Sequence, residues 1–416
     1  MTLSSVPALD VDRARARFSA LEREVGGRTA CFFDGAGGSQ APDSVIEAIS
    51  GYMRHSNANE GGAFVTSRET DALLVDAHAA AADLLGADAS EIAFGANMTT
   101  LNFLLTRAVG RTLEAGDEVI VTQLDHEGNA SPWLLLAEDR GLRVRMIGMR
   151  AEDGSLRMDE LEEALSDRTR VVAFTLASNA IGTVPDARRI VELAHGVGAL
   201  AWADGVHAAP HRALRFRELD LDVLLCSPYK FFGPHLGIAA VRHELAECWP
   251  AERVRPAAQA PAGHRFETGT LNHEAMAGAL AAIDYIADLA GTGGTRRESI
   301  AAAFSAIEDH ERALTLRFLD GAAGIAGLTL YGNADPERTA ERTPTFLVRV
   351  AGASPEDTAE ALGARGFFTW HGDFYAPGAI RGVGLDEAGG VRISFLHYNT
   401  HAEVDALLEA LHELAG

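Results

Sequence analysis

Short apolar segments alternate with amphipathic segments between about residues 90 and 245. The apolar segments are EVIVT, VRMIG, RVVAFTL, ALAWAD, DVLLCS and GIAAVR, and several of them are rich in β-branched residues. Segments such as MDELEEAL and ARRIVELAHGV separate them and have the spacing of helices. Apolar strands that alternate with helices predict a mostly parallel sheet with helices on both faces. We therefore expect an α/β fold for this part of the chain.

The pattern changes at about residue 274. Two long alanine-rich helical segments come first, and the strand-like segments LTLYG, TFLVRV and VRISF follow with helices between and after them. The last helix is predicted to begin at Thr400, because Thr400–Glu403 has the form of a capping box. We expect an N-terminal segment (1–30) that packs on the small domain, a large domain (31–273) and a smaller α+β domain (274–416).

Small polar or ionisable residues follow five of the predicted strands. In chain order these groups are Asn97–Thr100, Asp125–Asn129, Asn179, Asp204–His207 and Ser227–Lys230. Ligands of open α/β sheets bind outside the carboxyl ends of the strands. One such strand end would mean little, but five together predict a binding site.

Lys230 is the most informative of these residues. It follows a buried-looking strand within SPYKFFGP, and lysines are few in this arginine-rich chain. A pyridoxal phosphate enzyme needs a lysine for the covalent link to the cofactor and an acid that keeps the pyridine nitrogen protonated, which Asp204 could be. The cofactor's phosphate would suit the helix that begins near Thr99, with the Ser227 hydroxyl beside it and the His126 ring against the cofactor. The strand ends therefore predict a pyridoxal phosphate site.

Two nearby motifs are typical of different ligands. GVGALA (196–201) imitates a dinucleotide-binding fingerprint, but a helix precedes it and a strand follows it, which is the wrong order. His207 and His211 have the spacing of a zinc helix, although Pro210 disfavours one continuous helix there. We therefore predict no metal site.

Each of the polar residues at the strand ends also has an ordinary structural explanation. Taken singly, Asp204 could be a helix cap, and each other polar residue could be a surface or turn residue.

Composition narrows the classes of partner. The chain has 416 residues, which favours two domains or one large and one small domain. Its net charge is −23, and this argues against nucleic acids and anionic membrane surfaces as partners. Three cysteines form neither a disulfide framework nor a metal-binding spacing. No segment has the form of a signal peptide or a membrane span, so we expect a cytoplasmic protein.

A series of motifs follows in order along nearly the whole chain, namely FFDGAGGSQAP (32–42), NANEGGAFVTSRET (57–70), FGANMTTLNF, QLDHEGNASPW, ASNAIGT, ADGVHAAPH, SPYKFFGPHLG, FETGTLNHEA, RTPTFLVRV and VRISFLHYNTHAEVD. Together these motifs resemble those of a known family, the class V aminotransferase group of fold-type I pyridoxal phosphate enzymes, and within it the cysteine desulfurase-like proteins.

The resemblance implies roles for particular residues. Lys230 resembles the lysine that is linked to the cofactor, Asp204 the partner of the pyridine nitrogen, His126 the histidine stacked on the ring and His207 the group that bonds the ring hydroxyl. The other implied cofactor-binding residues are Met98, Thr99, Asn179, Ser227 and Tyr229, together with Gly269 and Thr270 from the other subunit. The last two imply a homodimer with a shared active site.

On the substrate side, Arg392 resembles the arginine that binds the substrate carboxylate, with Asn179 and Tyr375 beside it. The resemblance fails at one position that matters for the reaction. Cysteine desulfurases carry a nucleophilic cysteine on the loop before that arginine, where this chain has WHGDFYAPG (370–378), with Tyr375 at the expected position. Trp370 replaces a second carboxylate-binding arginine.

These residues imply an enzyme that acts on a small amino-acid substrate. The favoured reaction is a β-elimination that breaks a carbon–sulfur bond. Aminotransfer and epimerisation are alternatives, because both begin from the same carbanion. A non-catalytic pyridoxal phosphate-binding protein is a further alternative of another class.

Overall fold

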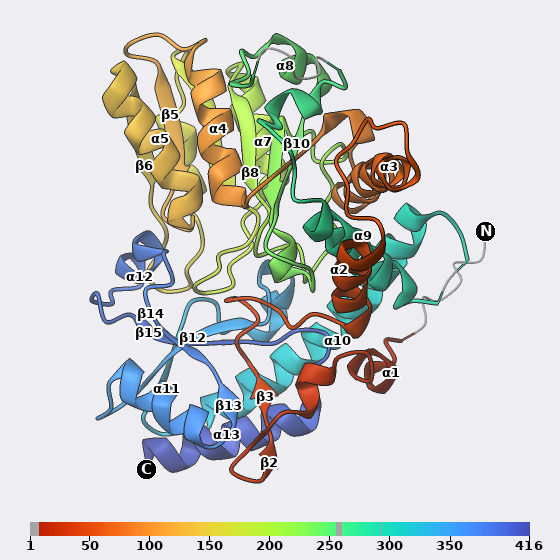
Figure 1. Cartoon of the computed structure of the whole chain (residues 1–416). Helices are drawn as coiled ribbons and strands as arrows, with labels where there is room; N and C mark the ends of the chain where they lie inside the picture. Colours follow the sequence, from red (N-terminus) through yellow and green to blue (C-terminus); the bar gives the residue numbers. More distant parts are fainter. Residues whose placement is uncertain (1–7, 255–259, 292) are drawn as a thin grey trace, which may run out of the picture.

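The computed structural model describes residues 8–254, 260–291 and 293–416 (Figure 1). Its largest sheet has seven strands in the order β4-β10-β9-β8-β7-β5-β6. The strands are β4 (Ile92–Gly95), β5 (Glu118–Thr122), β6 (Arg143–Ile147), β7 (Thr169–Thr175), β8 (Leu200–Asp204), β9 (Val223–Cys226) and β10 (Gly237–Val241). Neighbouring strands are parallel except at β10, which runs antiparallel to β4 and β9. The predicted α/β fold with a mostly parallel sheet is confirmed.

Helices cover both faces of this sheet because its central strands are apolar on both faces. In β7, Val172 and Phe174 belong to one buried cluster, whereas Val171 and Ala173 belong to another. Successive side chains of a strand point to opposite faces, so the two clusters lie on opposite sides of the sheet. The helices of this part are α2 (Asp43–His55), α3 (Val65–Leu85), α4 (Met98–Gly110), α5 (Glu127–Arg140), α6 (Met158–Ala164), α7 (Ala187–Gly196) and α8 (His243–Cys248).

A second sheet lies in the C-terminal part of the chain. Its strands are β11 (Leu328–Tyr331), β12 (Thr345–Val350), β14 (Trp370–Gly372) and β15 (Gly390–Ser394), in the antiparallel order β11-β12-β15-β14. The three strands expected from the sequence are present, and β14 is an additional one. The helices are α9 (His273–Asp288), α10 (Arg296–Ala323), α11 (Pro355–Ala364), α12 (Pro377–Gly382) and α13 (His401–Ala415). The capping box predicted at Thr400 begins α13.

The beginning of the chain connects the two parts. Helix α1 (Val11–Arg15) is tied to the C-terminal part because Arg15 Nη1 donates to the carbonyl of Tyr398 at 2.5 Å. A short hairpin, β1 (Glu24–Val25) with β2 (Arg28–Thr29), precedes β3 (Cys31–Phe32), which pairs in parallel with β13 (Phe367–Phe368). Helix α9 packs against α2 and α3. The predicted division into an N-terminal segment and two domains remains a proposal.

In Figure 1 the C-terminal sheet lies below the large sheet, on the side where the loops after the parallel strands emerge. Two close approaches join the parts at this level. Glu127 N, at the start of α5, donates to Tyr375 O at 2.8 Å, and a Cβ on Gly378 would lie 2.9 Å from the carbonyl oxygen of Gln123. The site described below lies at this contact between the two parts. None of the helices in the described part of the chain is both long enough and apolar enough to cross a membrane.

Candidate active site

The carboxyl ends of the parallel strands meet at an inner cavity of about 310 Å³. Nine of the eleven predicted cofactor residues line it, namely Met98, Thr99, His126, Asn179, Asp204, His207, Ser227, Tyr229 and Lys230. An outer cavity of about 620 Å³ lies against the C-terminal sheet and contains all three predicted substrate residues, Asn179, Tyr375 and Arg392. Lys230, His126 and Asn179 line both cavities, so they stand where the two meet.

Lys230 is the only lysine in the chain, and its amine is buried. The residue ends the short 3₁₀ turn Pro228–Lys230 after β9, with 8% of its surface exposed. Its Nζ donates to the carbonyls of Ala36 at 2.5 Å and Gly37 at 3.1 Å. Burial, followed by the charge of the Arg392 guanidinium, lowers the pKa of Lys230 to about 7, although the carboxylates of Asp204 and Asp34 oppose the shift. A neutral amine is therefore well populated near pH 7, which an ordinary solvated lysine would not provide.

Asp204 ends β8 with 3% of its surface exposed. Its Oδ1 accepts a hydrogen bond from Val206 N at 2.8 Å, and no described cation forms an ion pair with it. Burial raises the pKa of Asp204 to about 6, although the charge of Lys230 opposes this shift. A buried carboxylate without a cationic partner suits a protonated ring nitrogen, because the two charges would stabilise each other.

His126 presents a neutral imidazole ring. It is the N-cap of α5, and its Nδ1 accepts a hydrogen bond from Gly128 N at 2.9 Å. The proton of the neutral ring is consequently on Nε2. Burial, followed by the charges of Lys230 and Arg392, lowers the pKa of His126 to about 4. A neutral aromatic ring at the junction of the cavities can lie against a planar ligand.

The N-terminus of α4 offers an anion site beside the inner cavity. The side chain of Asn97 caps this helix by accepting from Thr100 N at 2.8 Å, and Met98 N donates to Ser227 Oγ at 3.1 Å. Strand β10 passes directly beneath, because a Cβ on Gly237 would lie 2.3 Å from the carbonyl carbon of Asn97. Free N–H groups and the helix dipole at such a terminus favour a phosphate.

Two further polar groups are buried at the inner cavity without a full set of partners. Asn179 donates through Nδ2 to the carbonyl of Phe374 at 3.0 Å, but its Oδ1 has no partner among the described residues. His207 Nε2 lies 3.0 Å from Thr345 Oγ1, and its Nδ1 is likewise unpartnered within the described chain. Buried polar atoms are almost always bonded, so these atoms indicate a polar ligand.

Arg392, on β15, is buried at the far wall of the outer cavity. Its Nη1 donates to the carbonyl of Asn179 at 3.0 Å, and its Cζ lies 4.3 Å from the centre of the Phe374 ring. Burial lowers the pKa of Arg392 to about 9, so the group is still charged near neutral pH. None of the ion pairs between described residues involves it. A buried guanidinium without a carboxylate partner suits the carboxylate of a ligand.

Comparison with known proteins places this chain in a family. A family model described as aminotransferase class-V matches residues 31–407. The chain belongs to the class V aminotransferase family. This class V aminotransferase is 32% identical over 442 residues to a cysteine desulfurase of Synechococcus elongatus. The alignment covers all of this chain and 67% of that protein. It is 30% identical over 416 residues to the aminotransferase-like protein FGM3 of Gibberella zeae, covering 98% of this chain and 99% of that one.

The solved structures agree with the fold. The cysteine desulfurase CsdA of Escherichia coli superimposes with a TM-score of 0.83 at 25% identity, covering 98% of this chain and 99% of that one. Enzymes of this family depend on pyridoxal phosphate, and this chain is a pyridoxal phosphate-dependent enzyme. The residues of the inner cavity fit that group, since a buried acid, a buried lysine, a flat neutral ring and a helix terminus surround one space. Bound there, the cofactor supplies an electron sink for a carbanion.

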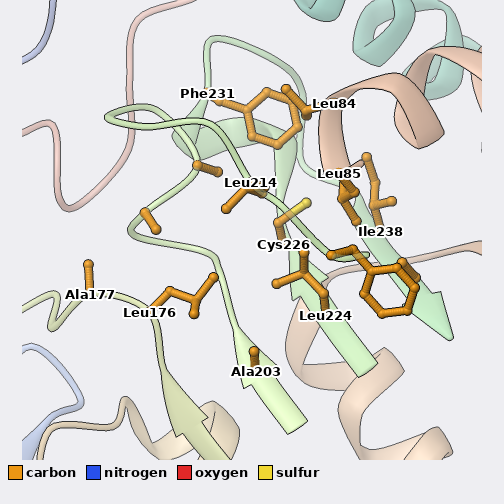
Figure 2. Packing of buried hydrophobic residues seen from close by; sticks show 14 of the residues in the cluster. Leu84, Leu85, Leu176, Ala177, Ala203, Leu214, Leu224, Cys226, Phe231 and Ile238 are labelled. Atoms are coloured by element: carbon orange, nitrogen blue, oxygen red, sulfur yellow. The ribbon is translucent and has the colours of Figure 1, made fainter. Parts of the chain in front are cut away.

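The cysteines of this class V aminotransferase lie outside both cavities. No cysteine is among the described residues that line either one. Cys226 is at the end of β9, and Figure 2 shows it packed among Leu85, Leu224 and Ile238. Burial raises the pKa of its thiol far above the ordinary value, and burial likewise raises the pKa of Cys31 to about 12. These two thiols are therefore poor sources of thiolate.

Some predicted residues are not brought together. Gly269 and Thr270 are exposed and line neither cavity of the single chain. The two histidines considered for zinc do not share a helix, because residues 206–211 form turns. Their rings are nevertheless in edge contact, with centres 5.0 Å apart, and His211 Nδ1 lies 2.9 Å from Glu311 Oε2.

One trio of side chains among the described residues is close enough to hold a metal ion. It consists of His78, His264 and Glu267 and lines neither cavity. Its closest contact is the 2.9 Å pair between His78 Nε2 and Glu267 Oε1.

Sequence reasoning missed several neighbours of the site. Asp34 is mostly buried, with an unpartnered Oδ1 in the described chain. Burial raises its pKa to about 6, and the charges of Arg392 and Lys230 oppose the shift. Ala36 accepts from Lys230, and Phe374 contacts Arg392. Asp34 and Ala36 both lie in the motif FFDGAGGSQAP, which could have identified them, whereas nothing in the pattern around Phe374 marks that residue.

Proposed function

We propose that this enzyme catalyses a β-elimination that cleaves the Cβ–S bond of an amino-acid substrate. The observation that carries the proposal is the position of Lys230, whose buried amine stands between the two cavities, together with the lack of a lining cysteine in the described chain. Removal of the Cα proton needs a base of this kind, and sulfur transfer to the enzyme would need a thiolate at the same place.

In this proposal each residue has a defined task. Arg392 binds the substrate carboxylate and orients Cα toward Lys230. The neutral amine of Lys230 accepts the Cα proton. The electron pair of that C–H bond then forms the Cα–Cβ double bond, and the thiol leaves with the electron pair of the Cβ–S bond. Water hydrolyses the released enamine to pyruvate and ammonia, so no oxidant or reductant is consumed.

The test is a panel of L-amino acids incubated with the enzyme, with and without a keto acid. Pyruvate and ammonia formed without a keto acid would establish elimination. A new amino acid that appears only with the keto acid would replace the proposal with aminotransfer. Loss of optical activity without net products would replace it with epimerisation, which begins with the same proton removal.

Exposure to L-cysteine should leave no persulfide on the protein. Tyr375 stands at the proposed position of the desulfurase cysteine, and a phenol cannot hold a sulfane sulfur. Sulfide should therefore appear with pyruvate and not with alanine. Replacement of Cys31, Cys226 and Cys248 by alanine should leave turnover within about twofold, since surface and packing changes away from the site act on stability. Alanine as the product, with a persulfide mapped to one cysteine, would contradict the proposal.

Replacement of Arg392 by alanine should weaken substrate binding by about 2–4 kcal/mol, because a buried charge pair loses one partner. Cofactor content, read from its absorbance, should be unchanged. Arg392→Lys is the matched control, because it keeps the charge without the planar fork and should lose less. Loss of the cofactor in the alanine variant would show that Arg392 is structural instead.

We also propose a homodimer in which Gly269 and Thr270 of one subunit approach the cofactor phosphate of the other. Both are exposed in the single chain. Large apolar side chains are exposed on and beside α2 and α3, where a monomer would not be expected to place them, namely Ile46, Met53, Phe64, Val65 and Val75. Light scattering on the active enzyme tests this, and a fully active monomer would refute it.

A further inference from the structure

The outer cavity extends beyond the space that a small amino acid needs. Its volume of about 620 Å³ lies within the range of about 300–1,000 Å³ that is usual for drug-sized ligands. Arg392 and Lys230 are buried at the inner wall of this cavity, where the α-carboxylate and Cα of a substrate would lie. The rest of the cavity is therefore available to the substrate side chain. This step depends on the proposed function, since it places the substrate by Arg392 and Lys230.

The part of the cavity available to the side chain is acidic. Glu127 and Asp373 both line it, and neither takes part in any ion pair between described residues. Both residues contact the backbone of Tyr375, because Glu127 N donates to Tyr375 O at 2.8 Å and Asp373 Oδ1 accepts from Tyr375 N at 3.0 Å. Ser131 Oγ donates to Glu127 Oε2 and fixes that carboxylate. Two further ionisable side chains line this region, namely His371, which is exposed, and His126, whose ring centre lies 5.8 Å from that of Tyr375.

Aromatic side chains stand beside these carboxylates. Trp370 and Tyr375 line the cavity although 51% and 74% of their respective surfaces are exposed, and Phe103 lines it from α4. Large aromatic groups left open at the wall of a cavity, next to unpaired carboxylates, form the kind of surface that binds ammonium groups. Arg392 is buried and packs against Phe374, whereas Asp373 and Tyr375 are exposed, so the cavity is positively charged at its buried wall and negatively charged at its exposed side.

The loop that carries this surface has an unusual backbone. Phe374 and Tyr375 have φ values of 59° and 54°, in the left-handed region that residues other than glycine seldom adopt. The conformation buries Phe374 against Arg392 and directs its carbonyl to Asn179, while Asp373 and Tyr375 remain at the exposed side. Strained residues of this kind persist where the surrounding structure fixes them, typically at binding sites.

We infer that the substrate is an amino acid with an extended side chain that ends in a cationic group, an ammonium or a quaternary amine. Glu127 and Asp373 neutralise that cation, and the faces of Trp370 and Tyr375 cover it. Arg392 binds the carboxylate at the other end of the same molecule. Specificity therefore comes from the distance between two opposite charges and not from the sulfur-bearing carbon alone.

The experiment is a binding titration of the cofactor-loaded enzyme, followed by the absorbance of the cofactor. Three ligands of similar length differ in the terminal charge, namely S-(2-aminoethyl)-L-cysteine, S-(2-hydroxyethyl)-L-cysteine and S-(2-carboxyethyl)-L-cysteine. The cationic ligand should bind about tenfold more tightly than the neutral one, and the anionic ligand should bind most weakly. Equal affinities, or tighter binding of the neutral or anionic ligand, would overturn the inference.

The double variant Glu127→Gln with Asp373→Asn should reduce the preference for the cationic ligand to less than about twofold and leave the affinity for the neutral ligand nearly unchanged. Glu138→Gln, a change of charge at an exposed position of α5 outside the cavity, should keep the full preference. If the double variant does not fold, Asp373→Asn alone should measurably reduce the preference for the cationic ligand over the neutral one. A preference that survives in a folded variant would refute the role of these carboxylates.

The titration separates this inference from the proposed reaction, because it measures binding and not turnover. Elimination of all three ligands with equal affinities would refute the cation site and support the proposed reaction. A preference for the cationic ligand without pyruvate would support the cation site and refute elimination.

Discussion

Replacement of Lys230 by alanine is expected to abolish turnover and the covalent attachment of the cofactor without unfolding the protein. The amine is the one group among the described residues at the junction of the cavities that we expect to accept a proton from Cα, and its pKa of about 7 suits this task. Proton transfer by a positioned base contributes about 10²–10⁴-fold to a rate, so the loss should be at least that large. Cofactor bound by the variant should dialyse away.

The composition of the chain makes this test unusually clear. Because Lys230 is the only lysine, borohydride reduction of the wild-type holoenzyme should add one pyridoxyl group at that residue, and the variant should gain none there. Lys230→Arg keeps a positive charge without a usable amine and should be as inactive as the alanine variant. Methylamine supplied in solution should restore part of the turnover of Lys230→Ala. Reduction that labels the variant at another position, or full activity without the lysine, would refute the assignment.

The sequence was sufficient to locate the inner cavity. Five strands of the large sheet (β4, β5, β7, β8 and β9) are short, apolar and followed closely by a polar residue, so alternation alone predicts that Asn179, Asp204 and Lys230 gather at one edge of the sheet. The rule needs no knowledge of side-chain contacts, since parallel strands bring their carboxyl ends together whatever their order. The same rule predicts that His126 and Ser227 lie at this edge, although it does not predict the strand order β10-β9-β8-β7.

The outer cavity could not be predicted in this way. Its wall comes from segments far apart in the chain, and the contact between Glu127 and Tyr375 depends on how the C-terminal sheet sits against the large one. Strand β14 has only three residues, which are too few for a periodic pattern. The backbone at Phe374 is left-handed although the residue is not glycine, so the sequence does not indicate this conformation. Asp34 follows the short strand β3, so no helix–strand alternation identifies it.

Replacement of Asp204 by asparagine is expected to lower turnover by orders of magnitude while the cofactor stays attached to Lys230. The carboxylate is buried and has no described cationic partner, so we assign it to the protonated ring nitrogen of the cofactor. An amide cannot hold that proton in place, and the carbanion would lose its electron sink. Single-turnover kinetics should place the loss in the chemical step, with substrate affinity little changed. Near-normal turnover would show that Asp204 serves only to accept from Val206.

Asp222→Asn is the matched control, because Asp222 is a buried carboxylate at the opposite end of the same sheet, beside the start of β9. It forms ion pairs with Arg242 and His195, so its replacement should lower stability and leave turnover per folded molecule intact. A loss of turnover in the folded Asp222 variant as large as that in Asp204→Asn would mean that the effect comes from burial of charge and not from the position of Asp204.

The stability of the cofactor-free protein gives an independent measurement on the same variant. The pKa of Asp204 rises from its usual 3.8 to about 6 on folding without the cofactor, so the folded state holds its proton more tightly than the unfolded state does. An acid whose pKa rises on folding destabilises the protein as pH increases from about 4 to about 6, and the cost then stays constant. Asp204→Asn should therefore melt at a higher temperature than wild type at pH 7 when both lack cofactor, with the difference vanishing below about pH 4. With cofactor bound the order should reverse, because the carboxylate then has its cationic partner. If melting temperatures showed the same order with and without cofactor at pH 7, Asp204 would not be the group that faces the ring nitrogen.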